Sequence, residues 1–423
     1  MAVRVSNIPA ELRAQRRAEL AEDSSTVTPL SGRAREVPLI AGPLERLEVL
    51  IGVERRGHRT EHRCSWGHRL AFAVKLANDI EVTDAATDQA SVPCALCGMP
   101  GLTLRGEVPG YVQGLNYKVW ECPSCQSQSA VGLPPFADIY DAIYARGQRL
   151  PGYSRYYGFA HLVKTSRRPL ARLSRCEDTY WAVSEVMRRQ AARTPLRVVE
   201  VASGLGYLTA ALRIAGMEAY GVDVSGVAVK RATDTFGPWY SVADAFSPDE
   251  WQVPEPDVIV ALELIEHVAD PVALIEKLTA KLPAHGQLVL STPNRTICSS
   301  AAVWQSDLPP VHLHWISGAG LAAAALRANC SIEFIDFSRY NRWARSTENE
   351  SRTSSVLPSR LSADLQPINP CSRVREWLLS STVAPLLYAL YRRMSGTIPA
   401  NRQQSGSLVA LITRSSGTWL PGQ

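Results

Sequence analysis

The chain has 423 residues, which is enough for two or three domains of ordinary size. Hydrophobic residues make up 46% and charged residues 20% of the sequence, a composition that excludes a disordered or fibrous chain. The 45 basic and 40 acidic side chains leave a net charge of only +5, so charge gives no indication of a nucleic-acid partner.

The N-terminal region, residues 1–90, contains no motif that assigns it a role. A charged helix is expected over 10–22, followed by a Ser/Thr/Pro-rich stretch and short apolar runs at 47–53 and 70–76. No apolar run of seven or more residues opens the chain, so we expect no secretory signal and a cytoplasmic protein. One short stretch indicates either a second metal site or, more simply, a basic surface loop: His58, His62, Cys64 and His68.

Two CxxC pairs define a small module over residues 91–130. They are Cys94 with Cys97 and Cys122 with Cys125, separated by residues 98–121, a spacing close to that of zinc ribbons. Strands are expected at 102–104 and 117–121, around a core so small that folding would depend on the metal. Neither pair opens a helix after a strand, as a redox dithiol does. We predict one structural zinc with four thiolate ligands and no catalytic role.

A helical linker is expected over residues 131–194. Its first part is rich in tyrosine, with Tyr140, Tyr144, Tyr153, Tyr156 and Tyr157 falling within one short stretch. The pattern indicates helices that connect the cysteine module to the domain that follows.

From residue 195 onward, apolar runs of strand length alternate with stretches of helix length. This alternation is typical of a parallel sheet with crossover helices. It predicts an α/β domain with a Rossmann-like, doubly wound, seven-stranded sheet over 195–340 plus 405–423. The expected strands are 197–201, 218–222, 239–242, 257–261, 287–291, 331–337 and 406–413.

Residues 341–404 form an expected α-helical insertion before the last strand. The segment 346–365 is polar, and an apolar run follows over 377–391, interrupted by Pro385 and flanked by arginines. The run is too short to span a bilayer, which needs about 20 residues. We expect a helix over the substrate pocket, and the alternative is peripheral contact with the inner face of the membrane.

A nucleotide site is predicted at the ends of the first three strands of this domain. Gly204 and Gly206 follow the first strand and precede a helix expected over 208–215, so backbone and helix N-terminus can approach a ligand closely. Asp223 ends the second strand about twenty residues later, where a carboxylate can accept both ribose hydroxyls. Asp244 and Phe246 end the third strand, where an adenine amino group and ring would lie.

The residues 198–206 and 221–225, VVEVASGLG and GVDVS, resemble the first motifs of class I S-adenosylmethionine (SAM)-dependent methyltransferases. Within that class, DVIVALELIEHVADP at 257–271 and STPNR at 291–295 are similar to the ubiquinone-biosynthesis O-methyltransferase group. The resemblance covers about 195–340 and the last strand. A dehydrogenase is the competing interpretation, but Thr209 occupies the place of the third glycine of GxGxxG.

The resemblance implies SAM as cofactor, held at the strand ends. Ala202 stands where the family more often has its first glycine, so we expect a slightly altered turn with binding retained. The implied contacts are Glu200, Ala202, Ser203, Gly204, Gly206, Asp223, Val224, Asp244, Ala245 and Leu262.

Two chemistries remain open after the fourth strand. Glu263, Glu266 and His267 would share one face of a helix, and two later imidazoles, His312 and His314, would point the same way from an extended segment. In metal-dependent relatives an ExxEH unit supplies ligands, which implies a Mg²⁺ or Mn²⁺ site at Glu263, Glu266 and His267 with His312 or His314. In metal-free relatives Glu266 fixes the loop and a histidine contacts substrate or acts as the base, the interpretation that we favour.

Either chemistry leads to a hydroxyl acceptor. A zinc module joined to such a domain resembles bacterial enzymes that modify sugars or surface glycans, so we expect a small molecule or a glycan. A lipid-linked or prenylated phenol is the alternative, and RNA is less favoured because no basic, aromatic-studded strip accompanies the site. A non-catalytic scaffold with a zinc docking module is the remaining hypothesis, and intact Glu200, Asp223 and Asp244 argue against it.

Overall fold

The computed structural model describes residues 2–4, 92–131, 137–150, 153–190, 195–297, 308–342, 359–370, 381, 390 and 401–415. Residues 1–8 and 82–423 belong to one compact unit. Three features predicted from sequence lie outside the described residues: the helix at 10–22, the His58, His62, Cys64 and His68 group, and all but two residues of the run 377–391.

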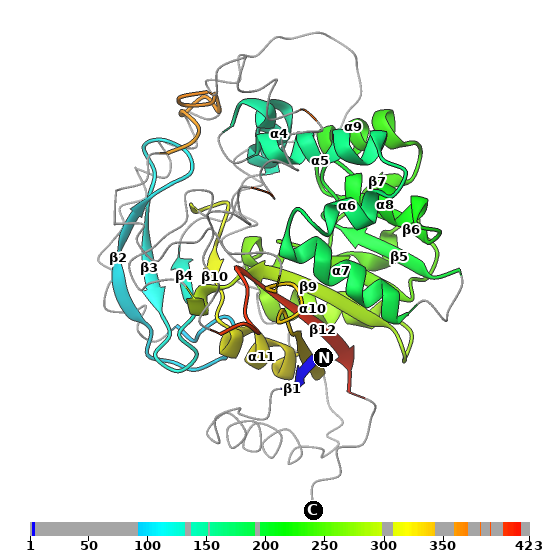
Figure 1. Cartoon of the computed structure of the whole chain (residues 1–423). Coiled ribbons are helices and arrows are strands. Elements are labelled where there is room, and N and C mark those ends of the chain that lie inside the picture. Colours follow the sequence, from blue (N-terminus) through cyan, green and yellow to red (C-terminus); the bar gives the residue numbers. More distant parts are fainter. Residues whose placement is uncertain are drawn as a thin grey trace, which may run out of the picture. The chain divides into compact units, whose positions relative to one another are not determined.

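The central sheet contains all seven predicted strands, and a short eighth strand pairs at its edge (Figure 1). Five neighbouring strands are parallel, and the last strand of the chain lies antiparallel between the fifth of these and an outer strand. In spatial order the strands are β1 (Ala2–Arg4), β11 (Cys330–Ile335), β12 (Ser407–Arg414), β9 (Gln287–Pro293), β8 (Val258–Ala261), β5 (Arg197–Val201), β6 (Glu218–Asp223) and β7 (Tyr240–Val242). The prediction of a doubly wound α/β fold is therefore confirmed.

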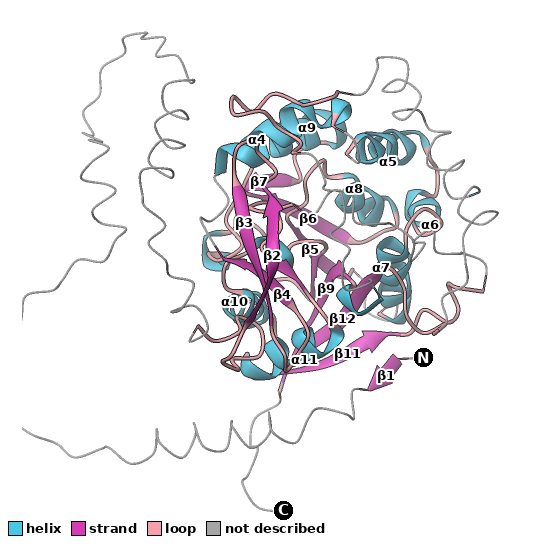
Figure 2. Cartoon of the chain, turned by 90° about the vertical axis from the view of Figure 1, so that its left-hand side faces the viewer, coloured by secondary structure: helices cyan, strands magenta, loops and turns pink. Residues whose placement is uncertain are grey.

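The helices of this sheet domain follow the strands as crossovers (Figure 2). They are α8 (Tyr207–Ile214), α9 (Gly226–Phe236), α10 (Pro271–Ala280) and α11 (Gly318–Arg327), with short 3₁₀ turns η3 (Pro248–Glu250), η4 (Ile265–His267) and η5 (Arg295–Ile297). The central strand β8 is apolar and buried along its whole length, because helices cover both faces of a parallel sheet. None of the described helices is both long and apolar enough to cross a bilayer.

The start of α10 shows how local sequence sets an element's boundary. Oδ1 of Asp270 accepts hydrogen bonds from the backbone N–H groups of Val272 (3.1 Å) and Ala273 (2.9 Å). Pro271 occupies the first turn, where its missing N–H costs no helical hydrogen bond. Asp270 and Pro271 therefore cap this helix.

The order in which the chain adds strands to the sheet reverses between β5 and β8. The chain proceeds outward from β5 to β6 and β7, then returns to place β8 on the other side of β5. Ligands of open α/β sheets bind at the carboxyl ends of the strands beside such a reversal. The segments that follow β5 and β8 are therefore the place to look for the site.

The cysteine module, predicted over 91–130 and ending at Val131 in the structure, contributes to a second sheet of four strands, which stands on the left in Figure 1. Three strands come from the module itself: β2 (Thr103–Pro109), β3 (Asn116–Glu121) and β4 (Gln128–Val131). The fourth, β10 (His314–Trp315), comes from the sheet domain and pairs antiparallel with β4. The module thus shares a strand with the domain beside it.

The segment expected to be a linker is helical and packs onto the sheet domain. It contains α4 (Ala137–Arg146), η2 (Gly147–Arg149), α5 (Ser154–Thr165), α6 (Pro169–Leu173) and α7 (Asp178–Arg189). Phe159, Trp181 and Met187 of this segment are buried in the same hydrophobic cluster as Val198 and Leu208 of the sheet domain. Burial of these large side chains, at about 1.5–3 kcal/mol each, fixes the helices in place.

Candidate active site

The turn after β5 contains three residues in the left-handed backbone region. They are Ala202 (φ 57°), Gly204 (φ 51°) and Gly206 (φ 74°). Glycine adopts this conformation without steric cost, and at Gly206 an added Cβ would also lie only 2.6 Å from Cβ of Ala232. Ala202 adopts it at a cost of about 1–2 kcal/mol, because its Cβ approaches the following carbonyl.

Asp223, at the end of β6, organises this turn. Its buried carboxylate accepts two backbone N–H hydrogen bonds, Oδ2 from Gly204 and Oδ1 from Ser225, both at 2.8 Å. Burial raises the pKa of the carboxyl, and the two N–H donors oppose that rise. A carboxylate offers about four lone-pair sites, so two remain for a ligand's hydroxyl groups.

Glu200 lies beneath the turn and joins β5 to α8. Its Oε2 accepts hydrogen bonds from the backbone N–H of Thr209 (2.7 Å) and from the Thr209 hydroxyl. Burial raises the pKa of this carboxyl to about 8. The structure therefore shows Glu200 supporting the helix whose N-terminus faces the turn.

The ends of β6 and β7 each supply one further candidate contact, an apolar side chain from Val224 and a carboxylate from Asp244. Val224 follows Asp223 and is 56% exposed, an unusual fraction for a valine beside a buried core. Asp244 is exposed, and its Oδ1 accepts the Phe246 N–H at 3.0 Å. The left-handed glycine turn, the paired lone-pair sites of Asp223 and this uncovered apolar surface fit the sugar and base of a nucleoside.

Three other predicted contacts lie in the same loops. Ser203 is buried in the turn itself, Ala245 is half-buried between Asp244 and Phe246, and Leu262 is half-buried against the main hydrophobic cluster. Ser203, Ala245 and Leu262 lie in the loops that follow the carboxyl ends of β5, β7 and β8, respectively.

A compact cluster of Glu266, His267 and His312 lies beyond the end of β8. The candidate ligand atoms of these three side chains all fall within 4.8 Å of one another. Nε2 of His267 is 3.9 Å from Oε1 of Glu266, whose side chain is 0% exposed, and the His267 and His312 ring centres are 4.4 Å apart. The structure thus brings together residues 45 positions apart in the chain, as the sequence predicted.

Hydrogen bonding and burial give the two imidazoles different properties. Nδ1 of His267 lies within hydrogen-bonding distance of the Val311 carbonyl, which assigns the proton to Nδ1 and leaves the lone pair on Nε2, on the side of Glu266. Burial lowers the pKa of His312 to about 3, so this ring is neutral at physiological pH.

Glu263 and His314 lie outside the cluster. Glu263 has a left-handed backbone (φ 51°), and the helical turn begins only at Ile265, so Glu263 does not share a helix face with Glu266 and His267. Its Oε1 accepts the Ser291 hydroxyl at 2.8 Å. Both ring nitrogens of His314 are engaged, Nδ1 with Oγ of Ser129 (2.8 Å) and Nε2 with the Val268 carbonyl (3.0 Å).

Two tyrosines of α4 reach the site, which the sequence did not predict. The ring of Tyr140 stands edge-on to His267 with ring centres 6.2 Å apart. The Tyr144 hydroxyl lies 3.0 Å from the position that a Cβ on Gly204 would occupy. Burial raises the pKa of both phenols, so they stay neutral. The tyrosine-rich composition was the available signal, but it did not indicate where the helix packs.

The four cysteines of the module converge with the geometry of a metal centre. Sγ of Cys94 is 3.7 Å from Sγ of Cys125, and Sγ of Cys97 is 3.5 Å from Sγ of Cys122. All four sulfurs lie within 4.8 Å of one another and all four residues are buried. A tetrahedral Zn–S₄ centre with bonds of 2.3 Å places its sulfurs about 3.8 Å apart, so the cluster fits zinc.

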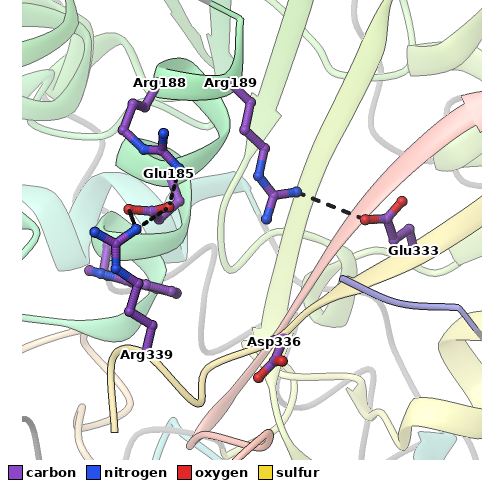
Figure 3. A pocket seen from close by; sticks show the side chains of 7 residues that line it. Glu185, Arg188, Arg189, Glu333, Asp336 and Arg339 are labelled. Carbon is purple, nitrogen blue, oxygen red and sulfur yellow. Dashed lines mark hydrogen bonds and ion pairs between the residues drawn. The ribbon is translucent and has the colours of Figure 1, made fainter. Parts of the chain in front are cut away.

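A pocket between α7 and the end of β11 shares no residue with this site (Figure 3). Arginine and carboxylate side chains line it in ion pairs, Glu185 with Arg188 (2.9 Å) and Arg339 (3.4 Å), and Arg189 with Glu333 (3.9 Å). Its charges largely neutralise one another, and exposed ion pairs contribute little. We assign the chemistry to the strand ends instead.

The sheet domain is similar to known methyltransferases. Residues 177–333 match the family described as a methyltransferase domain. A ubiquinone biosynthesis O-methyltransferase of Xanthomonas oryzae pv. oryzae is 29% identical over 171 residues, covering 37% of this chain and 72% of the relative. One of Xanthomonas campestris pv. campestris is 29% identical over 180 residues, covering 38% and 75%. A solved SAM-dependent methyltransferase from Mesorhizobium loti aligns with a TM-score of 0.32 at 16% identity, covering 52% of this chain and 91% of that one.

Proposed function

We propose that this chain, whose residues 177–333 form a class I SAM-dependent methyltransferase domain, methylates a hydroxyl oxygen of a small molecule or glycan. The observation that carries the proposal is the position of the Glu266, His267 and His312 cluster, in which Glu266 and His267 follow β8 while the glycine turn follows the adjacent β5. An acceptor between the two would lie beside both a proton acceptor and the methyl donor.

The strand ends supply the residues that would hold SAM. Asp223 would accept the ribose hydroxyls, and Val224 with Ala245 would contact the base, whose amino group Asp244 would meet. The turn over Ala202, Ser203, Gly204 and Gly206 would leave room for the amino-acid part. The bound sulfonium supplies an already activated methyl group, so alignment accounts for most of the rate acceleration.

Among the three histidines predicted as bases, the contacts favour His267. Its Nε2 carries the lone pair, and the buried Glu266 carboxylate at 3.9 Å would stabilise the imidazolium that forms when the acceptor hydroxyl gives up its proton. His312, with its pKa lowered to about 3, is a weak base at neutral pH. Both nitrogens of His314 are already engaged.

A cation at the same cluster is the second candidate, favoured by the convergence of three ligand atoms, two of them from the buried residues Glu266 and His312. Two imidazoles and one carboxylate suit Mn²⁺ or another transition metal better than Mg²⁺, which prefers oxygen ligands and water. Such an ion would lower the pKa of the acceptor hydroxyl.

The similar Xanthomonas proteins are named for ubiquinone biosynthesis, so a prenylated or lipid-linked phenol is the alternative acceptor. Membrane contact through the run 377–391 belongs to this alternative. A non-catalytic scaffold would need none of the cluster's three side chains.

Mass spectrometry of products from SAM and a panel of sugar, glycan and prenyl-phenol acceptors tests the proposal. A chelator too weak to remove thiolate-bound zinc should leave the rate unchanged if His267 is the base, while His267→Ala should lower it by about 10²–10⁴-fold. If a cation acts, the chelator should abolish transfer and Mn²⁺ should restore it. Binding of SAM without transfer to any acceptor, together with an unaltered complex of biosynthetic partners in His267→Ala, would favour the scaffold.

We also propose one structural zinc at Cys94, Cys97, Cys122 and Cys125. The spacing of the buried sulfurs supports it. Hydrogen bonding among the four sulfurs separates their pKa values, lowering those of Cys94 and Cys122 and raising those of Cys97 and Cys125. A bound dication would favour the thiolate form of all four.

A further inference from the structure

Strand β10 joins the cysteine module to the catalytic cluster. His314 and Trp315 pair with Ser129 and Gln128 of β4 in the module's sheet. Trp315 is also one of the buried residues of the module's small core, together with Tyr117, Val119 and Ala130. Because His312 lies only two residues before β10, the module's sheet determines where the chain that carries His312 runs.

On the module side, hydrogen bonds lead from the second cysteine pair to this segment. The Cys125 carbonyl accepts the Ser317 hydroxyl, and the Ser317 N–H donates to Oγ of Ser127 at 3.0 Å. Within β4, the Ala130 N–H donates to the Leu313 carbonyl at 2.8 Å. The contact is close-packed, since a Cβ on Gly320 of α11 would lie 2.1 Å from the Ser127 hydroxyl.

On the catalytic side, the same segment holds the loop that bears Glu266 and His267. The Leu313 N–H donates to the Glu266 carbonyl at 2.8 Å. The Val311 carbonyl accepts from Nδ1 of His267. The His314 ring spans the two sides, with Nδ1 bonded to Oγ of Ser129 in the module and Nε2 to the Val268 carbonyl in the loop.

We propose that the metal-filled cysteine centre positions the catalytic cluster. Ser129 and His314 are the positioning residues, because their hydrogen bonds connect the module to the segments that carry His267 and His312. The proposal rests on the proposed zinc and on the proposed role of the cluster. A module whose core contains only a few buried side chains depends on its metal for folding. Without the metal, β4 loses the sheet that holds it, and β10 with the 263–268 loop loses its partner.

Hydrogen–deuterium exchange on the full chain tests this without any acceptor. Zinc is removed with a high-affinity chelator, its loss is checked by elemental analysis, and the product S-adenosylhomocysteine is kept present. We expect faster exchange at 128–131, 311–317 and 263–268, unchanged exchange at 197–223, and recovery when zinc is restored. A weak chelator, which removes only loosely bound cations, should leave 128–131 and 311–317 unchanged.

Unchanged protection at 311–317 after zinc loss would overturn the proposal, as would a loss of protection that extends equally through 197–223. Because the experiment needs no methyl transfer, it can fail or succeed independently of the proposed reaction.

A substitution separates positioning from simple stability. Ser129→Ala removes the hydroxyl bonded to His314 and should lower kcat by roughly three- to tenfold, the effect of one hydrogen bond, with zinc content and SAM affinity unchanged. Ser129→Thr keeps the hydroxyl and should recover most of the rate. The matched control is Thr103→Ala, which removes an exposed hydroxyl bond to the Glu121 carbonyl in the same module and should leave kcat unchanged. A Ser129→Ala enzyme with wild-type kcat, or one matched by Thr103→Ala, contradicts the proposal.

Discussion

Replacing Glu200 by glutamine should make the free energy of unfolding much less dependent on pH. Burial raises the pKa of this carboxyl from 4.5 to about 8. The folded chain therefore binds a proton between these pH values that the unfolded chain has released. The corresponding stability is fully present below pH 4.5 and is lost as the pH rises to about 8. At 1.36 kcal/mol per pH unit, the loss over that interval is on the order of 5 kcal/mol.

Glutamine keeps the shape of the side chain and an oxygen that can accept from the Thr209 N–H, but it does not ionise. Denaturant unfolding followed from pH 5 to pH 9 should therefore show a steep decline in wild-type stability and a flatter profile in Glu200→Gln. The variant should become the more stable protein at the alkaline end. Glu255→Gln, at an exposed position, serves as the control and should follow the wild-type curve. Parallel curves for wild type and Glu200→Gln would refute the reasoning.

Three further predictions concern the cofactor turn and the metal. Asp223→Ala should weaken binding of S-adenosylhomocysteine by about 1.5–3 kcal/mol in calorimetry, since charge-assisted hydrogen bonds are lost; unchanged affinity would exclude the assigned role. Ala202→Gly should raise the free energy of unfolding by up to about 1 kcal/mol, because relief of the left-handed alanine exceeds the added entropy of the unfolded chain; a less stable variant would contradict this. Elemental analysis of protein purified without added metal should find one zinc per chain, and a content near zero in folded protein would rule out the thiolate centre.

The strands could be predicted from sequence because each buried strand is a local apolar run between polar or glycine-rich turns. Arg197–Val201 matches the prediction to the residue, and the others differ at their ends by one or two positions. The short strand Ala2–Arg4 has no such signal, since it forms only by pairing with β11. The glycine turn and Asp223 were predictable for the same reason: strand, turn and carboxylate follow one another in the sequence.

The arrangement of the catalytic side chains depends on contacts between distant parts of the chain. Spacing alone placed Glu263 with Glu266 and His267, whereas a left-handed backbone at Glu263 directs it to Ser291. His312 and His314 are equivalent in sequence, and only the pairing of β10 with β4 separates them.

The tyrosine-rich segment shows the same limit. Its composition is evident in the sequence, but the position at which its first helix packs is not. Helix α4 is held over the strand ends by partners some 85 residues away: the Ser225 hydroxyl donates to Asp141, and the Arg231 guanidinium donates to the Tyr144 carbonyl at 2.6 Å. Ser225 in turn donates its N–H to Asp223, so the residue that holds α4 also contacts the carboxylate that is predicted to bind the ribose hydroxyls. Cofactor binding at Asp223 and the placement of Tyr140 and Tyr144 therefore depend on one hydrogen-bonded unit. Substitutions in α4 that break its bond to Ser225 should accordingly weaken SAM binding, although Asp141 was predicted only as part of a linker.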